Sequence, residues 1–562
     1  MKRKQLLESL SAPIFLLALF WVVRYWHSIH FGLYEDDLTI LPSAMQMSFG
    51  EMVRFVFSYI VNFYGQARPL HHSFIYLFSW LGWHMGGLWG PYWIGYILTS
   101  INVCLFYFLL KRAYTPGFAF VGGLAYILYS ADTTQAYLTM SLGFQPSMTF
   151  LLCAFHAYYS NKRVLAYVLA FLIFFSYETP ALVFLAAPLL KKDWNKRLLK
   201  EFLVHAAILG LMVALVYVLR VRIVGTVGVL NMTPGQMVIP VLKHILQGPL
   251  VSLGTYLYRP LQTLKSLNPE TALAVILAFA LFTWLLSRLT LTARARIKDL
   301  WQAIKDPVAR KSLPEELKSP GRMIVTGLVM LLMAYPLTFT VRAYAISGRD
   351  TRVHAAGVAG AAILLASVFL LFLSLANGRR LWRWTVNGVM ALALALMVGY
   401  GFVIQRDYVL AWQYQRGFWT ELLPLIQDAK SDTYILVTSD GLKDTSQIDA
   451  NTWALSNVLG QLYEFPSASA PRVFRLRAGW QDHLDASASI YLSGVTSYVA
   501  PDFYEKANFP NIILIDTSSG KMVRRTAPLT VDGQSYSIMQ LGDPLLSSYP
   551  RSLLYRLMIV QP

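Results

Sequence analysis

Long apolar runs separated by short polar segments dominate residues 1–404. A helix needs about 20 mostly apolar residues to cross about 30 Å of hydrocarbon, and eleven runs reach or approach that length. These runs are 12–29, 90–110, 116–131, 145–160, 164–177, 180–190, 202–223, 271–288, 323–341, 353–376 and 384–404. The pattern therefore predicts a mainly α-helical, polytopic membrane protein with about eleven transmembrane helices.

The pattern changes after Gln405, where the apolar runs shorten to the length of strands. Tyr434–Val437 and Ile512–Ile515 are typical of buried strands, and residues 451–463 carry a helical pattern. We therefore expect two domains, a transmembrane domain over 1–404 and a small α/β domain over 405–562. The second has no Gly-rich phosphate loop, nucleophile elbow or metal-ligand spacing, which favours a module that docks an acceptor or a partner.

Composition agrees with a membrane protein, because 56% of the residues are apolar or aromatic and only 14% are charged. The two cysteines, Cys104 and Cys153, each lie inside an apolar run without Cys-x-x-Cys spacing. They exclude a disulfide framework and a thiolate metal site.

The net charge of +18 belongs to the membrane half, since 1–404 holds 35 Lys and Arg against 15 Asp and Glu, and 405–562 holds 13 against 15. The basic residues cluster in short segments at helix ends without interleaved aromatic residues, which excludes nucleic acid as a partner. These segments are 2–4, 111–112, 162–163, 191–200, 288–322 and 379–383.

By the positive-inside rule these segments are cytoplasmic, so the N-terminus is cytoplasmic and 405–562 is extracytoplasmic in the cell membrane. A basic start followed by an apolar run also resembles a signal peptide. The lack of a small-residue cleavage site and the alternation of charge favour a first transmembrane helix. The long connections 30–89 and 224–270 are then outside, and 288–322 is an inner basic segment on anionic lipid.

Two runs, 164–177 and 180–190, are too short to cross the membrane alone. They flank Ser176-Tyr177-Glu178-Thr179-Pro180, which predicts a broken hairpin with a carboxylate at its outer tip.

Three consecutive acids, Glu35, Asp36 and Asp37, follow the first predicted helix. Adjacent carboxylates repel each other, so their proximity is unfavourable unless a raised pKa, a cation or a proton transfer makes use of it. The alternatives are a solvated loop start or N-caps for the helix that follows.

The surrounding order of motifs resembles a known family. The acids are followed by Arg68-Pro69-Leu70, a short apolar segment with a Gly/Trp-rich end, and a second full helix closed by Lys111-Arg112. This order, over roughly residues 10–190, is similar to membrane glycosyltransferases of the GT-C superfamily, in the branch of lipid A aminoarabinose transferase and the protein O-mannosyltransferases. Many relatives have Asp-Glu where this chain has Glu-Asp-Asp, so the position of the catalytic acid stays open between Asp36 and Asp37.

The resemblance implies a GT-C-like fold and transfer of a hexose or pentose from a polyprenyl-phosphate donor to an acceptor hydroxyl at the outer face, with inversion. The acceptor is a lipid, a glycan or a protein. A carboxylate takes the hydroxyl proton during attack, with Asp36 as first choice, Asp37 as second, and Glu35 orienting either.

The leaving phosphate needs fixed cations, and the planar guanidinium of Arg can hold two phosphate oxygens. We expect this role for Arg68, Arg349, Arg352 and Arg259. The alternative for each is an arginine that extends to lipid headgroups.

Polar residues in or near apolar runs are candidates for a cavity that binds sugar or acceptor, namely Asp132, Tyr177, Glu178, His71 and His72. The adjacent histidines diverge by about 100° on a helix, so they are poorly placed to share one ion. The resemblance leaves a divalent cation, Mg²⁺ or Mn²⁺, open, with Asp36 and Asp132 as its ligands if one binds.

Two other classes of protein remain as alternatives. A secondary transporter predicts inverted repeats and charges near the middle of helices, whereas the carboxylates here gather at outer helix ends. An outer-leaflet polysaccharide polymerase or ligase would use Arg and His in large outer loops and leave the acids without a role.

Overall fold

The structure is a computed structural model of the 562-residue chain. It describes residues 2–62, 67–191, 194–224, 234–288, 315–338, 342–376, 379–438, 445, 447, 458–465, 470–476, 484–485, 489–491, 506–531 and 533–559. Most of the predicted inner basic segment 288–322, and residues 451–457 of the predicted helical pattern, lie outside these residues.

The chain divides into two compact units, each described here by itself. Unit 1 contains Met1–Ile29, Val53–Phe78 and Trp89–Gln405, and unit 2 contains His30–Met52, Ser79–Leu88 and Arg406–Pro562.

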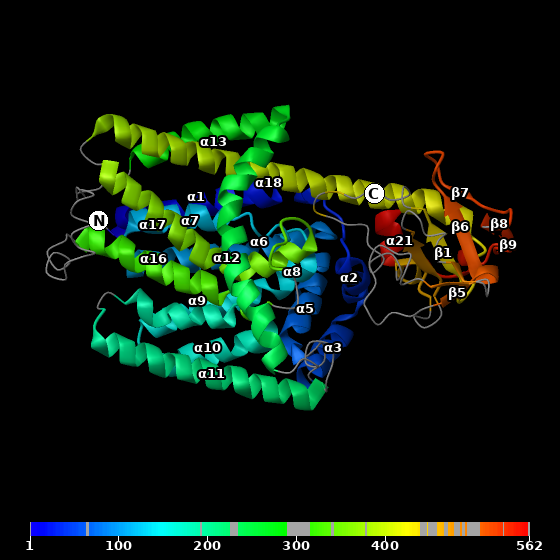
Figure 1. Ribbon diagram of the computed structural model, residues 1–562, viewed down its shortest axis with the longest axis horizontal. Helices are drawn as coiled ribbons and strands as arrows, with labels where there is room; N and C mark the ends of the chain where they lie inside the picture. Colours follow the sequence, from blue (N-terminus) through cyan, green and yellow to red (C-terminus); the bar gives the residue numbers. More distant parts are fainter. Residues whose placement is uncertain are drawn as a thin grey trace. The chain divides into compact units, whose positions relative to one another are not determined.

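Unit 1 is built from helices (Figure 1). In chain order they are α1 (Lys2–Tyr25), η1 (Ser28–His30), α3 (Phe49–Asn62), α5 (Pro69–Gly86), α6 (Trp89–Ala113), α7 (Pro116–Ile127), α8 (Leu138–Gly143), α9 (Gln145–Tyr159), α10 (Arg163–Ser176), η2 (Ala181–Leu190), α11 (Lys196–Val224), α12 (Pro234–Lys265), α13 (Pro269–Ser287), α16 (Glu315–Met333), η4 (Arg349–Gly357), α17 (Val358–Ala376) and α18 (Arg380–Leu422). Of these, η1, α3, α5 and α18 continue into unit 2.

The described residues contain eight helices that are long and apolar enough to cross a membrane, together with four shorter apolar helices. The prediction of a mainly helical, polytopic membrane protein is therefore confirmed. The predicted break at 177–180 is also present, because α10 ends at Ser176 and η2 begins at Ala181.

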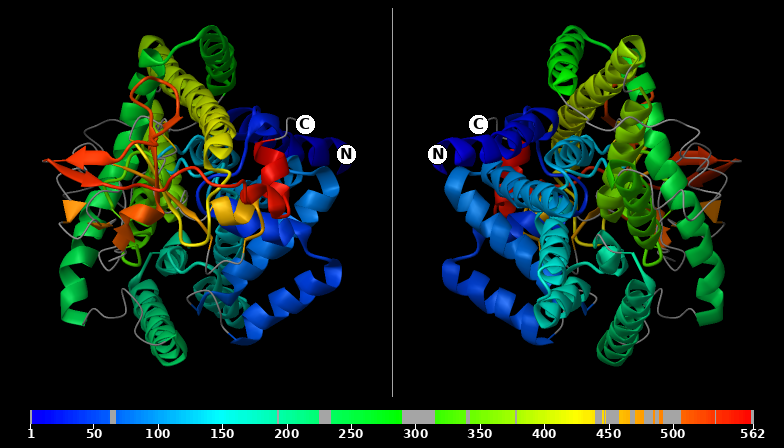
Figure 2. Two further views of the ribbon diagram at one scale, coloured as in Figure 1. Left: turned by 90° about the vertical axis from the view of Figure 1, so that its right-hand side faces the viewer. Right: turned by 90° about the vertical axis from the view of Figure 1, so that its left-hand side faces the viewer.

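The predicted loop 224–270 is wrong in one respect, because it contains the 32-residue helix α12. Pro240, Pro249 and Pro260 lie inside this helix and interrupt its apolar pattern. Neighbouring helices in membrane proteins can satisfy the backbone groups that a proline frees, so such helices persist. In Figures 1 and 2, α12 runs across the direction of α11, α16 and α17.

Close packing of helices depends on small residues at one crossing. A Cβ on Gly360 of α17 would lie 2.4 Å from the backbone nitrogen of Leu331 on α16, so only glycine permits this approach. The 3₁₀ segment η2 packs against α9, α10, α11 and α16, and its apolar side chains are part of the core.

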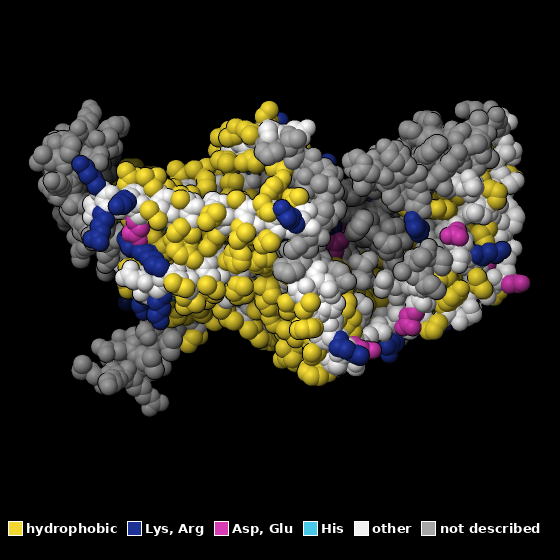
Figure 3. Space-filling view, turned by 90° about the horizontal axis from the view of Figure 1, so that it is seen from below, with side chains coloured by type: hydrophobic (Ala, Val, Ile, Leu, Met, Phe, Trp, Pro, Cys, Tyr) yellow, Lys and Arg dark blue, Asp and Glu magenta, His cyan; other side chains and the backbone are white. Residues whose placement is uncertain are grey.

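Three of the predicted basic segments meet at one end of unit 1. Arg112, at the end of α6, donates to Ser160 Oγ after α9 at 3.0 Å. Lys191, after η2, and Arg163, at the start of α10, both pair with Glu201 of α11. Figure 3 shows Lys and Arg side chains gathered at one end of a broad apolar surface. Which side of the membrane this end faces stays a prediction.

Unit 2 contains α2 (Asp36–Gln46), η5 (Leu423–Ile426), a mixed sheet and the final helix α21 (Leu553–Met558). The sheet has the order β2-β1-β6-β7, formed by β2 (Arg472–Arg475), β1 (Tyr434–Val437), β6 (Ile512–Asp516) and β7 (Val523–Arg524). Its central strand β1 pairs in parallel with β2 and β6, so both predicted strands are confirmed. Smaller ladders join β3 (Leu484–Asp485), β4 (Ser489–Tyr491) and β5 (Lys506–Asn508), and β8 (Leu529–Val531) with β9 (Gln534–Tyr536).

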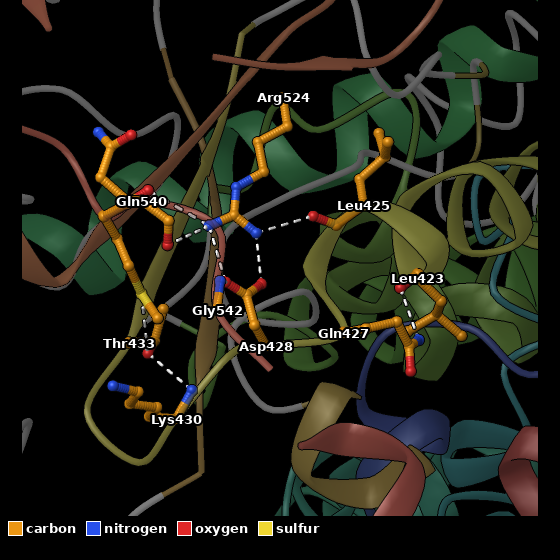
Figure 4. A network of polar contacts seen from close by, with 10 residues as sticks. Leu423, Leu425, Gln427, Asp428, Lys430, Thr433, Arg524, Gln540 and Gly542 are labelled. Atoms are coloured by element: carbon orange, nitrogen blue, oxygen red, sulfur yellow. Dashed lines mark hydrogen bonds and ion pairs between the residues drawn. The ribbon is translucent and has the colours of Figure 1, made fainter. Parts of the chain in front are cut away.

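A buried ion pair joins the segment after η5 to the sheet (Figure 4). Arg524 of β7 donates to both carboxylate oxygens of Asp428, and Gly542 N donates to Asp428 Oδ2 at 2.9 Å. The guanidinium also donates to the carbonyls of Leu425 and Gln540 at 3.2 Å. Hydrogen bonds to every charged oxygen make such a buried pair tolerable, and they fix the local geometry.

Candidate active site

The three predicted acids form a buried turn at the start of α2 in unit 2. The side chains of Glu35 and Asp37 are enclosed, at 3% and 0% exposure, whereas Asp36 is half-buried. Glu35 has φ 49° and ψ −114°, a backbone conformation that side chains other than glycine rarely adopt. Such a conformation costs about 1–3 kcal/mol and persists only where the surroundings impose it. A solvated loop start would have neither property.

Hydrogen bonds define the shape of this turn. Asp37 N donates to Tyr34 O and Leu38 N donates to Glu35 O, each at 3.0 Å. The hydroxyl of Tyr34 donates to the carbonyl of Tyr408 at 2.9 Å. Asp36 and Asp37 occupy the first turn of α2, where the positive end of the helix dipole stabilises carboxylates.

Burial, with a smaller contribution from the nearby Asp37 carboxylate, raises the pKa of Tyr34. The phenol is therefore protonated at neutral pH and keeps its hydrogen bond to the Tyr408 carbonyl. A neutral donor at this point holds the acidic turn against the end of α18 without adding charge.

Arg68 and Glu178, both predicted from the sequence, form an ion pair in unit 1, and Arg220 of α11 joins them. Arg68 Nε donates to Glu178 Oε2 at 2.8 Å, and its Nη2 donates to Oε1. Arg220 Nη2 donates to Glu178 Oε2 at 3.1 Å and to the carbonyl of Phe174 at 2.7 Å. One carboxylate therefore holds two guanidinium groups, which leaves a net positive charge. We call these three residues the Glu178 triad.

The charges of the triad decide the protonation of Glu178. Burial alone would raise its pKa, but attraction to Arg68 and Arg220 outweighs burial and lowers the pKa to about 2. The carboxylate is therefore ionised at any physiological pH.

Aromatic and polar side chains surround the triad. Tyr177 lies beneath the Arg68 guanidinium, with 4.8 Å between the guanidinium carbon and the ring centroid, and its ring lies 5.2 Å from that of His71. Burial, together with His72 and Arg68, lowers the pKa of His71 to about 3, so the imidazole is neutral. Within the described part of the chain, three enclosed polar atoms near the triad have no hydrogen-bond partner, namely Arg220 Nε, Thr179 Oγ1 and His71 Nδ1. Enclosed polar atoms of this kind call for a bound ion, water or ligand group.

A cavity of about 70 Å³ with both polar and apolar side chains in its lining lies in unit 1 between α1, α6, α9, α17 and the segment 129–135. Arg24 and Asp132 supply its charged groups, and Gln135 and Gln145 supply its amide groups. Arg24 Nη1 donates to Gln135 Oε1 at 3.0 Å, and Asp132 Oδ1 accepts from Thr134 N at 2.9 Å. Burial raises the pKa of Asp132, although Thr134 and Arg24 act in the opposite direction. A cavity of this size holds several water molecules or a small polar group.

Phe144 connects the two polar regions of unit 1. It lines the cavity, and its ring lies 5.3 Å from that of Tyr177, which packs against Arg68. The structure therefore brings Arg68, Tyr177, Glu178 and His71 into one cluster, with Asp132 in the cavity beside it. His72 lies on the far side of His71, with its ring 5.6 Å from that of Tyr59.

The other predicted arginines lie elsewhere in unit 1. Arg259 of α12 is buried, donates to Gln262 Oε1 at 2.6 Å and to the carbonyl of Ile346, and stacks on Tyr400. Arg349 and Arg352 lie on η4.

Hydrogen bonds attach η4 to the segment that carries Asp132. Thr351 of η4 accepts from Thr133 N at 3.1 Å, which couples this helix to the wall of the cavity. His354 Nε2 donates to the carbonyl of Ala345 at 2.8 Å, so His354 Nδ1 accepts from the hydroxyl of Tyr335. The segment on which Arg352 lies is thus fixed on both sides.

The sequence reasoning did not single out Arg24, Gln135 or Arg220. Arg24 lies near the end of the first apolar run and Arg220 lies inside the run 202–223. An arginine within an apolar helix is itself a signal, since it needs a polar partner. Among the described residues there is no group of three His, Cys, Asp or Glu side chains that could hold a metal ion.

Comparison with known proteins finds similarity among solved structures only. No family model and no curated protein matches this sequence. The chain is similar to the crystal structure of ArnT from Cupriavidus metallidurans in the apo state, at 14% identity over 83% of this chain and 86% of that chain, with a TM-score of 0.31. ArnT is a lipid A aminoarabinose transferase. At this TM-score the likeness assigns no function.

Proposed function

We propose that this protein is a membrane glycosyltransferase that moves a sugar from a polyprenyl-phosphate donor to an acceptor hydroxyl. The observation that carries the proposal is the buried acidic turn with its unusual backbone at Glu35. Residues held in rare conformations cluster at sites where geometry serves chemistry. The order of motifs around this turn supports the same class of enzyme.

The acidic turn supplies the base in this proposal. Asp36 is half-buried and Asp37 fully enclosed, so Asp36 is the carboxylate that an acceptor hydroxyl can reach. The hydroxyl oxygen attacks the anomeric carbon, its proton passes to the carboxylate, and the bond to the phosphate oxygen breaks on the opposite face. The configuration at the anomeric carbon inverts. Asp37 and Glu35 hold the turn that presents Asp36.

The Glu178 triad supports binding of the leaving phosphate in unit 1. Its net positive charge and its fixed guanidinium planes suit an oxyanion, and Glu178 orients Arg68 through both of its carboxylate oxygens. Arg349 and Arg352 are further candidates, because Arg352 Nε is enclosed without a partner among the described residues. Arg259 donates to the carbonyls of Ser130 and Ile346, so its contacts favour a role in holding these two segments together rather than in binding the donor.

The cavity is the candidate site for sugar or acceptor hydroxyls. Asp132, Gln135 and Arg24 offer both donors and acceptors, and Tyr177 and His71 lie beyond its Phe144 wall. Activity with and without a chelator tests whether Mg²⁺ or Mn²⁺ binds at Asp36 or Asp132. We propose in addition that the N-terminus is cytoplasmic and that the C-terminal domain is extracytoplasmic.

Substitution of each aspartate tests the assignment of the base. Membranes containing the wild type, Asp36→Asn or Asp37→Asn are assayed with synthetic polyprenyl-phosphate hexoses and pentoses, by following release of the polyprenyl phosphate. We expect the variant that lacks the base to lose activity by on the order of 10²-fold or more. Glu270→Gln is the matched control, because this half-exposed carboxylate pairs only with His27 among the contacts described.

Full activity in both aspartate variants would overturn the acidic turn as the base. Uptake of a solute into proteoliposomes without any transfer would support the transporter instead. Sugar transfer that persists in both aspartate variants but is lost when outer arginines are replaced would favour an outer-leaflet polysaccharide polymerase or ligase.

A further inference from the structure

A second charged cluster lies at the basic end of unit 1, apart from the candidate active site. Glu201, near the start of α11, accepts from Tyr158 Oη at 2.7 Å and from Lys191 Nζ at 2.8 Å, and it also pairs with Arg163 Nη2. These four side chains come from the ends of α9, α10, η2 and α11. We call them the Glu201 cluster.

The cluster has donor capacity in excess of its one carboxylate. Two cations share Glu201, so the cluster carries a net positive charge. Arg163 Nη1 is enclosed and has no hydrogen-bond partner among the described residues. Both cationic side chains are about one-third exposed, so they lie at the surface rather than in the core.

The wall behind the cluster is rigid. The guanidinium carbon of Arg163 lies 3.4 Å from the centroid of the Tyr158 ring, which packs against Phe184 and His205. His205 is fixed by Tyr167 Oη at one ring nitrogen and by the Phe184 carbonyl at the other, each at 2.9 Å. The two cations are therefore held in a defined position without a ligand.

An exposed apolar surface begins within one turn of the cations. Near the cations, the exposed apolar side chains of α10 and α11 include Val164, Leu165, Val168, Leu199, Leu203 and Val204. Further cations are exposed at the same end, namely Lys162, Lys196, Arg197 and Lys200. Figure 3 shows the lower side of the protein as drawn in Figure 1, where α10 and α11 lie, with Lys and Arg at one end of the apolar surface.

We propose that the Glu201 cluster binds the headgroup of an anionic phospholipid. The headgroup phosphate lies against Arg163 and Lys191, and the acyl chains follow the exposed apolar faces of α10 and α11. The surplus of positive charge selects a headgroup with net negative charge over a zwitterionic one, since basic pockets between membrane helices favour anionic lipids. This site is independent of the sugar-transfer reaction.

Thermal unfolding of the purified full-length protein in detergent tests the site. Phosphatidylglycerol or phosphatidylcholine with the same acyl chains is added, and the rise in Tm is measured for each lipid. We expect phosphatidylglycerol to raise Tm clearly more than phosphatidylcholine. In the double variant Arg163→Gln/Lys191→Gln we expect at least half of that difference to disappear. Lys265→Gln, at the exposed end of α12, is the matched control and keeps the full difference.

Glu201→Gln separates binding from a structural role. It removes the negative charge from the cluster, so a bound anionic lipid should raise Tm as much as in the wild type or more, although the variant without lipid is less stable. Equal responses to the two lipids, or a full phosphatidylglycerol response in the double variant, would overturn the proposal. Should the double variant fail to fold, Lys191→Gln alone serves the same comparison, with a smaller expected loss.

Discussion

Replacement of Glu178 by glutamine gives the most direct test of the triad. The substitution keeps the shape of the side chain but leaves two partly buried guanidinium groups without a counter-charge. Loss of one partner of a buried pair costs about 3–5 kcal/mol. We therefore expect Glu178→Gln to lower stability more than any substitution of an exposed carboxylate.

The pKa of Glu178 gives an independent magnitude. Its value falls from 4.5 to about 2, and each unit corresponds to about 1.4 kcal/mol, so ionised Glu178 stabilises the fold by about 3 kcal/mol. Because the folded pKa is the lower one, this contribution is complete above pH 4.5 and is lost as pH falls from 4.5 towards 2. The cost of breaking a buried ion pair and the value from the pKa shift are thus both consistent with a loss of about 3 kcal/mol.

The assay is thermal unfolding of the purified protein in detergent between pH 7 and pH 3. We expect the Tm of Glu178→Gln to lie well below that of the wild type at pH 7, and the gap to narrow as pH falls below 4.5. Glu270→Gln is the control, since its half-exposed pair with His27 contributes at most about 1 kcal/mol. A Tm for Glu178→Gln equal to that of the wild type at pH 7 would refute the reasoning, and so would a gap that does not change with pH.

Three further substitutions test particular contacts. Gly143→Ala places a Cβ 2.4 Å from His71 Cε1, so we expect this imidazole to move, with a loss of about 1–3 kcal/mol in unfolding experiments and reduced sugar transfer; an unchanged variant would contradict the geometry. Asp428→Ala leaves the buried Arg524 without its counter-charge and should lower the free energy of unfolding by about 3–5 kcal/mol. We expect faster proteolysis of residues 406–562, and an unaltered rate of cleavage would disprove this. Glu35→Gly and Glu35→Ala both remove the carboxylate, but only glycine relaxes at φ 49°, so we expect the glycine variant to be more stable by about 1 kcal/mol or more; equal Tm values would argue against backbone strain.

The elements of this fold followed largely from the sequence, because a membrane imposes a simple rule on apolar length. The predicted strands at 434–437 and 512–515 and the break at 177–180 are all present. Helix α12 was missed because its prolines and polar residues interrupt the apolar pattern. In the folded protein, contacts with other helices provide hydrogen-bond partners for its polar groups. One such contact joins Thr263 Oγ1 of α12 to the carbonyl of Leu396.

Local sequence patterns could not predict which residues pair with each other in the site. Arg68 and Glu178 are 110 positions apart, and Arg220 is a further 42 positions along the chain. A pattern identifies an arginine that needs a partner, but the choice of partner depends on which helix ends meet in space. The burial of Glu35 and Asp37 likewise depends on the Tyr34 hydrogen bond to Tyr408, 374 positions away.

The central position of β1 has a consequence for how the chain matures. Val437 precedes Ile515, its partner in β6, by 78 residues, which is about 4–16 s of synthesis. Until the later segment arrives, one edge of β1 presents unpaired backbone groups and apolar side chains. If the ribosome stalls in this interval, β1 stays exposed as an unpaired, aggregation-prone strand. Chaperones and proteases of the cell would therefore act first on the C-terminal region of this protein.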